Sequence, residues 1–345
     1  GYDAASRVST LTRPNGMVTT HSYDDSGRVT ALVTELLGSE IHAITTTYDE
    51  RGIPATQTDQ EGTHVYAHDQ RGRLTGVDHP DGAAFGDESY AYDQAERRTE
   101  SHRDPASEVV YDDGDRLVQD ATYTYQYDDE GRRVGRTHRV SGVQTTYAYT
   151  VLNQILFYSV GSDESEFFYD ARGRVVMVAT QQDEAVVRMS AVYDRSGNIR
   201  ATYGSSLEQS YVAGFGFGEA LSLWRSSVLW DRLGSVVGQV DENGVVSFDL
   251  RDPWGNSAPG ANPQTAFGFQ GHPSFVPGLV AAPARQFEPM SGQWISEDPR
   301  FDQPRYLGMG GAPCYLTDHT GESYGLFMKT GLCAAVLVGA GVGSF

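Results

Sequence analysis

Short runs in which apolar or aromatic residues alternate with polar ones recur along the chain. In Tyr123–Tyr127 the alternation places three tyrosines on one face of an extended strand. Such runs end in turn signals, where aspartate accepts hydrogen bonds from backbone N–H groups and glycine supplies a positive φ. This pattern predicts many short antiparallel strands joined by tight turns, with little helix before residue 320.

The strand-and-turn pattern is an internal repeat, Tyr-Asp-x-x-Gly-Arg followed by an apolar residue. Copies begin at Tyr2, Tyr23, Tyr48, His68, Tyr92, Tyr111, Tyr127, Tyr169 and Tyr193, and Tyr149 occupies the place of a decayed copy. From Tyr2 to Tyr127 the copies start 16 to 25 residues apart, so each unit is about one hairpin. Because a lone hairpin is marginal in water, neighbouring units must pair into one continuous sheet. The repeat predicts equivalent turn positions for Asp24, Asp49, Asp128, Asp170 and Asp194.

The amino-acid composition argues against several classes of function and of site. The chain has 46 acidic and 26 basic residues and a net charge of −20, which argues against binding to nucleic acid or to anionic lipid. Its 20 tyrosines and 39 glycines suit strands and turns. Two cysteines, Cys314 and Cys333, are too few for a disulfide framework or a four-cysteine zinc site.

The sequence lacks the common signatures of turnover enzymes. There is no G-x-S-x-G, H-E-x-x-H or P-loop, and Gly214–Gly218 lacks the spacing of a dinucleotide fingerprint. His64 and His68 could share a strand face as metal ligands, but we expect ordinary surface histidines. Asp112–Asp115 could suggest calcium, but it falls in a turn of the repeat. We therefore predict no cofactor and no metal.

The repeat resembles the YD repeat of RHS proteins, toxin-complex C subunits and teneurins over roughly residues 1–200. Further ordered motifs resemble the RHS repeat-associated core: Leu229–Val236, Val240–Gly244, Arg251–Asn256, Phe267–His272, Ala284–Pro299, Gly310–Pro313 and Asp318–Gly321. The resemblance implies an all-β fold in which YD hairpins form a spiralled, hollow shell closed by an inward-rolling core. It divides the chain into a shell (1–223), a core that plugs it (224–321) and the start of a variable C-terminal region (322–345).

The resemblance also implies a function and a place. It points to a secreted or cell-surface bacterial shell that encapsulates its own C-terminal passenger, often a toxin, with secretion-system or surface proteins as further partners. The competing interpretation is an extracellular scaffold or adhesion protein without cleavage. A third interpretation, a self-processing enzyme whose own cleavage is its main activity, ranks lowest. Leu332–Phe345 is apolar and uncharged, but its fourteen residues are too few for a membrane helix.

The resemblance further implies self-cleavage carried by Arg285, Asp298 and Asp318, at the Glu322–Ser323 bond. Of two close carboxylates, one can hold a proton while the other activates water, and an arginine can stabilise the oxyanion. The chain departs from the family pattern twice, with His319 for proline and Glu322 for leucine. Alternatively, the two aspartates cap turns and Arg285 pairs with one of them. At most, then, the sequence predicts an aspartic-type autoproteolytic activity.

Overall fold

The structure, a computed structural model, describes residues 1–195, 199–204, 208–210, 212–213, 220–223, 226–259, 268–298, 305–318, 320–321 and 325–326. Within these ranges the regular elements are thirty β-strands and two 3-10 helices, η1 (Phe269–Gly271) and η2 (Gly308–Gly311). The prediction of an all-β chain is confirmed. No helix among these residues is long and apolar enough to cross a membrane.

The strands form five antiparallel sheets in which each strand pairs with the next along the chain. The first sheet contains β1 (Thr10–Thr12), β2 (Met17–Tyr23), β3 (Val29–Leu36), β4 (Ser39–Tyr48), β5 (Pro54–Asp59), β6 (Gly62–His68), β7 (Leu74–Asp78), β8 (Glu88–Tyr92) and β9 (Arg98–Ser101). The second contains β10 (Val110–Tyr111), β11 (Leu117–Gln119), β12 (Tyr123–Tyr127), β13 (Arg133–His138), β14 (Gln144–Tyr149), β15 (Ile155–Val160), β16 (Asp163–Tyr169), β17 (Val175–Gln182), β18 (Ala185–Tyr193), β19 (Ile199–Gly204) and β20 (Glu208–Ser210).

The remaining sheets are smaller. The third contains β21 (Val212–Ala213), β22 (Ala220–Leu223), β23 (Ser226–Trp230), β24 (Val236–Val240) and β25 (Val246–Phe248). The fourth contains β26 (Val280–Ala281), β27 (Gln286–Glu288) and β28 (Gln293–Trp294), and the fifth contains β29 (Leu316–Thr317) and β30 (Gly325–Leu326).

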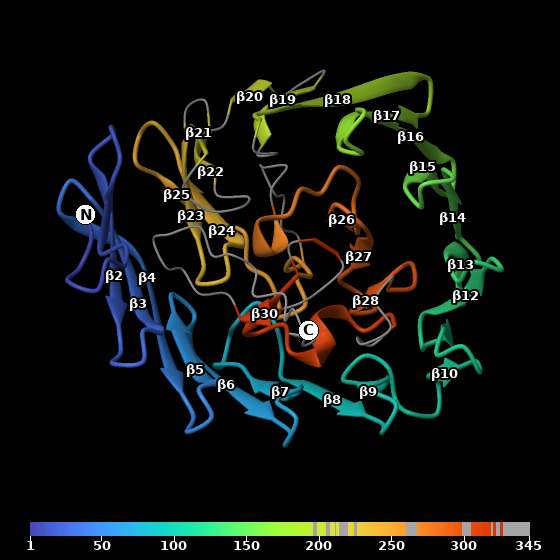
Figure 1. Cartoon of the computed structure of the whole chain (residues 1–345), viewed down its shortest axis with the longest axis horizontal. Coiled ribbons are helices and arrows are strands. Elements are labelled where there is room, and N and C mark those ends of the chain that lie inside the picture. The colour runs from blue at the N-terminus through green and yellow to red at the C-terminus, as the bar shows by residue number, and fades with distance from the viewer. Residues whose placement is uncertain are drawn as a thin grey trace, which may run out of the picture.

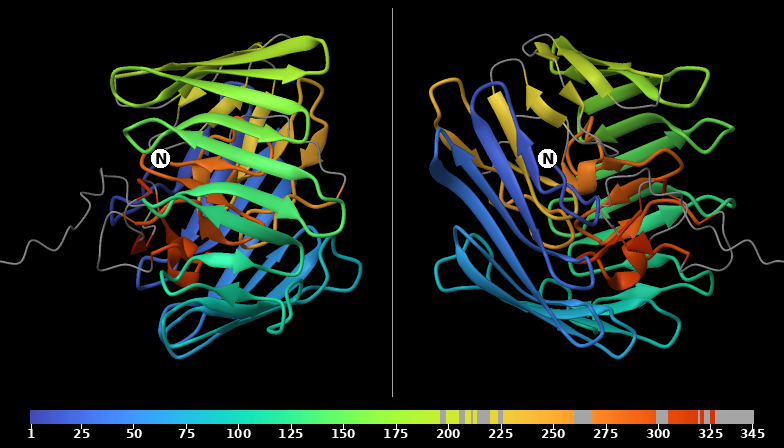
Figure 2. Two further views of the ribbon diagram at one scale, coloured as in Figure 1. Left: turned by 90° about the vertical axis from the view of Figure 1, so that its right-hand side faces the viewer. Right: turned by 60° about the vertical axis from the view of Figure 1, so that its left-hand side comes forward.

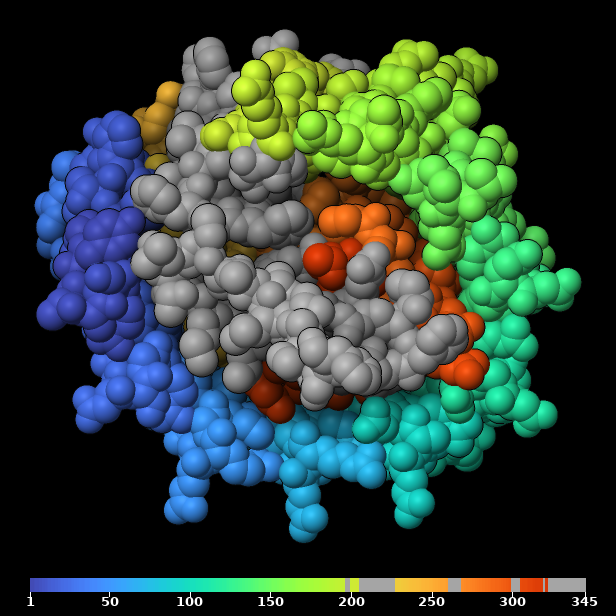
Figure 3. Space-filling view, viewed as in Figure 1, coloured from blue at the N-terminus to red at the C-terminus, as the bar shows by residue number. Residues whose placement is uncertain are grey.

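The two large sheets make a ring-shaped wall. Figure 1 shows them following one another from β2 through β9 and then from β10 to β20, with the sheet β21–β25 beside β2–β4. Seen from the side, the strands lie next to one another across the wall (Figure 2). The described residues from 268 to 321, coloured orange and red, lie inside the ring, and the space-filling view shows the orange ones seated there (Figure 3).

The repeated motif produces the same local structure in successive copies. The strand register shifts just before the motif's first residue, between Ser22 and Tyr23 and again, for example, between Thr47 and Tyr48. In the following turn, the Asp24 carboxylate accepts hydrogen bonds from Nε of Arg28 at 2.6 Å and from its backbone N–H at 2.9 Å. The same pair of bonds recurs at Asp3, Asp69, Asp93, Asp112, Asp128 and Asp170.

The predicted turn positions of the aspartates are confirmed where they are described. Asp24, Asp128 and Asp170 hold the turn as above, and Asp49 holds it through Arg51 and the backbone of Ile53. Asp194 follows the same register shift at Tyr193, but the turn residues 196–198 lie outside the described residues.

Tyrosine and arginine connect each repeat to the next. The Arg174 guanidinium lies 4.5 Å from the centre of the Tyr193 ring, in the following copy. The Tyr193 hydroxyl donates back to the carbonyl of Val175 at 2.8 Å. The same stacking joins Arg7 to Tyr23, Arg28 to Tyr48, Arg73 to Tyr92, Arg97 to Tyr111, Arg116 to Tyr127 and Arg132 to Tyr149. The motif therefore stabilises its own turn and also joins its repeat to the neighbouring repeat.

We expect Tyr149→Phe to lower the free energy of unfolding by about 1–2 kcal/mol, because it leaves the carbonyl of Arg133 without the hydroxyl that donates to it at 2.7 Å. Urea unfolding at pH 7 measures the change. The matched control is Tyr2→Phe, because Tyr2 is 56% exposed. Equal effects at the two positions would contradict the role of the hydroxyl.

The hydrophobic core lies between the wall and the segment inside it. One cluster joins wall residues such as Ile155 and Val178 to Phe275 and Ile295. A second joins Leu74 and other wall residues to Trp254, Phe269, Phe287, Trp294 and Leu307. A third packs Met17 of β2 against Leu229 and Val240 of the third sheet. The described residues from 268 to 321, called the inner segment below, thus share a hydrophobic core with the wall.

Candidate functional site

The structure brings together the three residues of the predicted cleavage site. Arg285 precedes β27, Asp298 follows β28 and Asp318 follows β29, and all three are at most 5% exposed. Nη2 of Arg285 lies 2.6 Å from Oδ2 of Asp298 and 3.4 Å from Oδ2 of Asp318. Because both carboxylates contact one nitrogen, their oxygens cannot be farther apart than these two distances laid end to end.

Asp318 is held in a turn that ends at Gly321. Its Oδ1 accepts the backbone N–H of Gly321 at 2.8 Å and that of Thr320 at 3.2 Å. Nε2 of His272 lies 2.9 Å from the carbonyl oxygen of Asp318, which fixes the start of the turn. Asp318 therefore caps a turn and also faces Arg285, so the two interpretations from the sequence apply to it together.

Arg285 is the centre of the cluster. Its guanidinium lies 4.4 Å from the centre of the Trp294 ring, and its Nε donates to the carbonyl of Gly321. Burial lowers the pKa of Arg285, and Asp298 and Asp318 act against this by stabilising its charge. With both acids ionised, the three side chains carry one net negative charge. The guanidinium thus reduces the repulsion that would force two isolated carboxylates to share a proton.

Gly321 is the last residue described before the predicted scissile bond. A side chain at this position would place Cβ 2.9 Å from the backbone nitrogen of Arg285, and its φ of +76° is in the left-handed region. Its N–H is bound by Asp318 and its carbonyl by Arg285, so the cluster holds the backbone at Gly321 from two sides. His319, Glu322 and Ser323 lie outside the described residues.

A second buried ionic cluster, which the sequence analysis missed, joins the inner segment to the wall. Glu288 lies at the end of β27 and contacts Arg133 at 2.5 Å and Arg136. Arg133 is fully buried and Glu288 is 1% exposed. Burial raises the pKa of Glu288, but the two arginines and a hydrogen bond from Ser291 outweigh it, and the pKa lies below the usual value.

The sequence carried a signal for this cluster. The residue after Gly-Arg is apolar in most copies, as Val29, Leu74 and Val175 are, but Arg133 stands there after Arg132. The position faces the interior, so a charge there needs a buried partner. The partner is 155 residues away, which explains why the repeat alone did not identify it.

Tyrosines of the inner segment bind turns of the wall. The Tyr306 hydroxyl donates to the carbonyl of Gly131 at 2.8 Å, and the Tyr315 hydroxyl donates to that of Gly72 at 3.0 Å. Both acceptors are the glycines of repeat turns. The inner segment thus binds the wall through the motif that also builds the wall.

The expectation that His64 and His68 are surface histidines is wrong for His64, which is buried, and His68 is half-buried. The side chain of His64 is 7% exposed, and the ring of His68 packs against Tyr315 at 5.9 Å between ring centres. Burial and the nearby Arg51 lower the pKa of His68 to about 4. Both side chains face the inner segment because the alternation of β6 turns even-numbered residues inward.

Asp112 lies in the repeat turn predicted for it, where Arg116 binds its carboxylate at 2.7 Å. Cys314 is a buried free thiol, and burial raises its pKa. Gly214–Gly218 and Cys333 lie outside the described residues. Among the described residues, no group of histidine, cysteine, aspartate or glutamate side chains is arranged to hold a metal ion.

Comparisons with known proteins agree with this architecture. A family model described as Teneurin YD-shell matches residues 2–306. A structure of the Photorhabdus luminescens Tc holotoxin pore with a mutation in TccC3 aligns with 96% of this chain and 19% of its own, at a TM-score of 0.69 and 14% identity. The crystal structure of TcdB2-TccC3-TEV aligns with 93% and 19%, at a TM-score of 0.68 and 14% identity.

These solved structures share the fold, and the chain spans about a fifth of their length. No curated protein matches the chain.

Proposed function

Because the chain belongs to the Teneurin YD-shell family, we propose that its structural shell encloses the chain's own C-terminal polypeptide. The observation that carries the proposal is the path of the chain: wall strands surround the described residues from 268 to 321, and Gly321 is bound inside by Arg285 and Asp318. A segment that leaves Gly321 starts from within the ring. The proposed units are the shell (1–223), the plug (224–321) and the start of the passenger (322–345).

The proposed passenger is a toxin, and the proposed location is the cell surface or the exterior. The similar solved structures are those of a Tc holotoxin pore and of TcdB2-TccC3, which supports an assembly with further secreted or surface proteins. The alternative is an extracellular scaffold without cleavage. A reading frame that continues past Phe345 into a nuclease, deaminase or transferase sequence would favour the container, whereas a secretion signal with a stop near Phe345 would favour the scaffold.

We further propose that Arg285, Asp298 and Asp318 cleave the chain at Glu322–Ser323. In this scheme one carboxylate takes a proton from a water molecule whose oxygen bonds to the carbonyl carbon of Glu322, and Arg285 stabilises the charge on the carbonyl oxygen. As the bond to Ser323 breaks, the carboxyl group gives that proton to the departing nitrogen. Support comes from the burial of all three side chains and from their contact with Gly321.

We expect denatured wild-type protein to run as two fragments and Asp318→Asn to run as one intact chain. Asparagine keeps the acceptor for the N–H of Gly321 but cannot take the charge or the proton. Intact-mass measurement identifies the cleaved bond. The control is Asp128→Asn, which changes an aspartate of a wall turn and should leave cleavage unchanged. An intact wild-type chain would overturn the cleavage proposal and favour the scaffold.

A further inference from the structure

A chain of four buried titratable side chains crosses four neighbouring wall strands, β5 to β8. Nδ1 of His64 lies 2.8 Å from Nδ1 of His79, and the two rings meet edge to face. At the outer ends, Nε2 of His64 lies 3.3 Å from Asp59 and Nε2 of His79 lies 3.0 Å from Glu88. The side chains are between 1% and 13% exposed.

These contacts limit the number of protons that the two rings can hold. Asp59 is a carboxylate: burial raises its pKa, but hydrogen bonds from His64 and from the N–H of Glu61 outweigh this, and the pKa is lowered. Glu88 accepts the hydroxyl proton of Tyr90 on its second oxygen. At 2.8 Å only one of the two facing Nδ1 atoms can carry hydrogen, and it donates to the other. The closed pair thus holds at most three protons on its four nitrogens.

A fourth proton has no place in this arrangement. It could bind only the accepting Nδ1, and two N–H groups would then face each other across the present hydrogen bond. In the opened or unfolded chain both imidazoles are free to become charged, because the ordinary histidine pKa is about 6.5. Below this pKa, opening therefore takes up a proton, so a fall in pH favours the opened wall.

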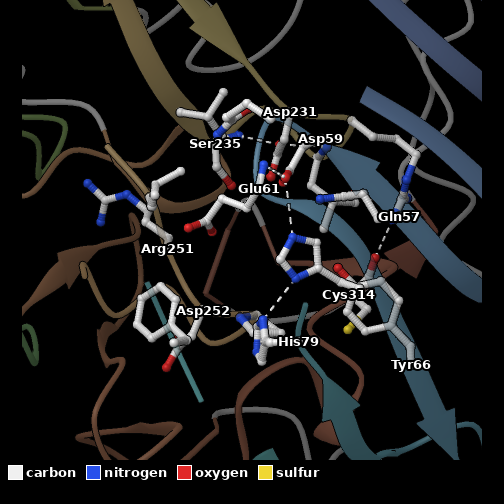
Figure 4. A pocket seen from close by; sticks show the side chains of 18 of the residues that line it. Gln57, Asp59, Glu61, Tyr66, His79, Asp231, Ser235, Arg251, Asp252 and Cys314 are labelled. Atoms are coloured by element: carbon white, nitrogen blue, oxygen red, sulfur yellow. Dashed lines mark hydrogen bonds and ion pairs between the residues drawn. The ribbon is translucent and has the colours of Figure 1, made fainter. Parts of the chain in front are cut away.

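The pair lies where the wall meets the inner segment. It borders a cavity of about 100 Å³ that this part of the wall shares with residues after β23 and β25 (Figure 4). Charged or titratable side chains face the cavity from both sides: His42, Glu61 and Tyr66 from the wall, and Asp231, Arg232, Arg251, Asp252 and Cys314 from the inner side. Asp87, which accepts the N–H of His79, completes the surroundings.

We propose that the His64–His79 pair is an acid-released latch of the shell wall. Near neutral pH it holds β6 to the segment between β7 and β8, and below the ordinary histidine pKa it lets these strands open beside the inner segment. The latch joins wall elements only, so it is independent of self-cleavage. Asp252 acts in the opposite direction, because burial and nearby Glu88 raise its pKa to about 6 and its protonation favours the folded state. Local opening rather than global stability is therefore the readout.

Hydrogen exchange of the full chain at pH 7 and pH 5 tests the latch. After correction for intrinsic rates, protection in β6 and β7 should fall by about sixfold or more at pH 5, because two free imidazoles with a pKa of about 6.5 take up the proton that the closed pair excludes. Strands β15 and β16, which contain no histidine, serve as the internal control. An equal loss in all four strands, or no loss in β6 and β7, overturns the proposal.

His79→Gln is the matched variant. Glutamine can accept from Nδ1 of His64 and donate to Glu88, so His64 can become fully charged without facing another N–H. We expect the acid-dependent loss of protection to disappear in this variant, and its persistence overturns the proposal. If the variant does not fold, nitrogen-15 spectra of histidine-labelled wild type decide. One proton coupled to both Nδ1 nuclei at pH 7 supports the latch, and two independent rings contradict it.

Discussion

Replacing Glu288 with alanine is expected to lower the free energy of unfolding by about 3–5 kcal/mol. The change leaves Arg133, which is fully buried, and Arg136 without their shared counter-ion, and an uncompensated buried charge is strongly destabilising. Urea unfolding at pH 7, followed by tryptophan fluorescence, measures the loss. The change also removes the link between β27 inside the ring and β13 in the wall, so the inner segment should become accessible to protease.

An exposed pair of the same type provides the control. Arg139 and Glu108 lie 2.6 Å apart with side chains 32% and 38% exposed, and Glu108→Ala should cost less than about 1 kcal/mol. Similar losses for Glu108→Ala and Glu288→Ala would show that burial does not set the strength of the Glu288 contacts.

The effect of Glu288 should depend on pH with a definite sign. Its pKa in the folded state is lowered, so its ionic contribution is present above the ordinary glutamate pKa and is lost as pH falls through the lowered value. Wild type and Glu288→Gln should therefore differ most near neutral pH and converge in strong acid. A difference that grew on acidification would contradict the ionic contribution.

The parts of the fold that the sequence predicted depend on neighbouring residues. Asp24 and Arg28 are four positions apart and close their turn by themselves. The six-residue motif therefore contains both partners of the hydrogen bonds that hold the turn. Tyr193 reaches only to Val175 in the preceding unit, and the regular spacing makes this contact foreseeable. A strand-and-turn repeat can therefore be recognised from one sequence.

The contacts that close the shell were not foreseeable in the same way. Arg133 donates a hydrogen bond to Glu288, and Arg103 donates one to Asp252, each across about 150 residues of sequence. No spacing rule relates these partners. A surface position was predicted for His64, because alternation reveals two faces of a strand but not which of them another segment covers. Arg285, Asp298 and Asp318 were brought together by resemblance, and their separation along the chain would not have indicated it.

Two glycines in matching turns test how tightly the interior is packed around Phe269. Gly234 and Gly255 both close an Asp-x-x-Gly turn by donating to the carbonyl of its aspartate, at 3.3 Å and 2.9 Å, with φ of +87° and +92°. Their surroundings differ. A Cβ on Gly234 would meet nothing within 4 Å, whereas a Cβ on Gly255 would lie 2.5 Å from Cγ of Phe269. The two positions separate backbone strain from overpacking.

We expect Gly234→Ala to cost about 1 kcal/mol, the strain of a side chain at positive φ, and Gly255→Ala to cost about 3 kcal/mol, because overpacking adds to the same strain. Phe269 cannot move freely, since it is 4% exposed and stacks on Phe287 at 5.8 Å. Urea unfolding of both variants at pH 7 measures the difference. Equal losses of unfolding free energy would mean that the Phe269 side chain moves aside for the new methyl group. The packing around Phe269 would then not be rigid.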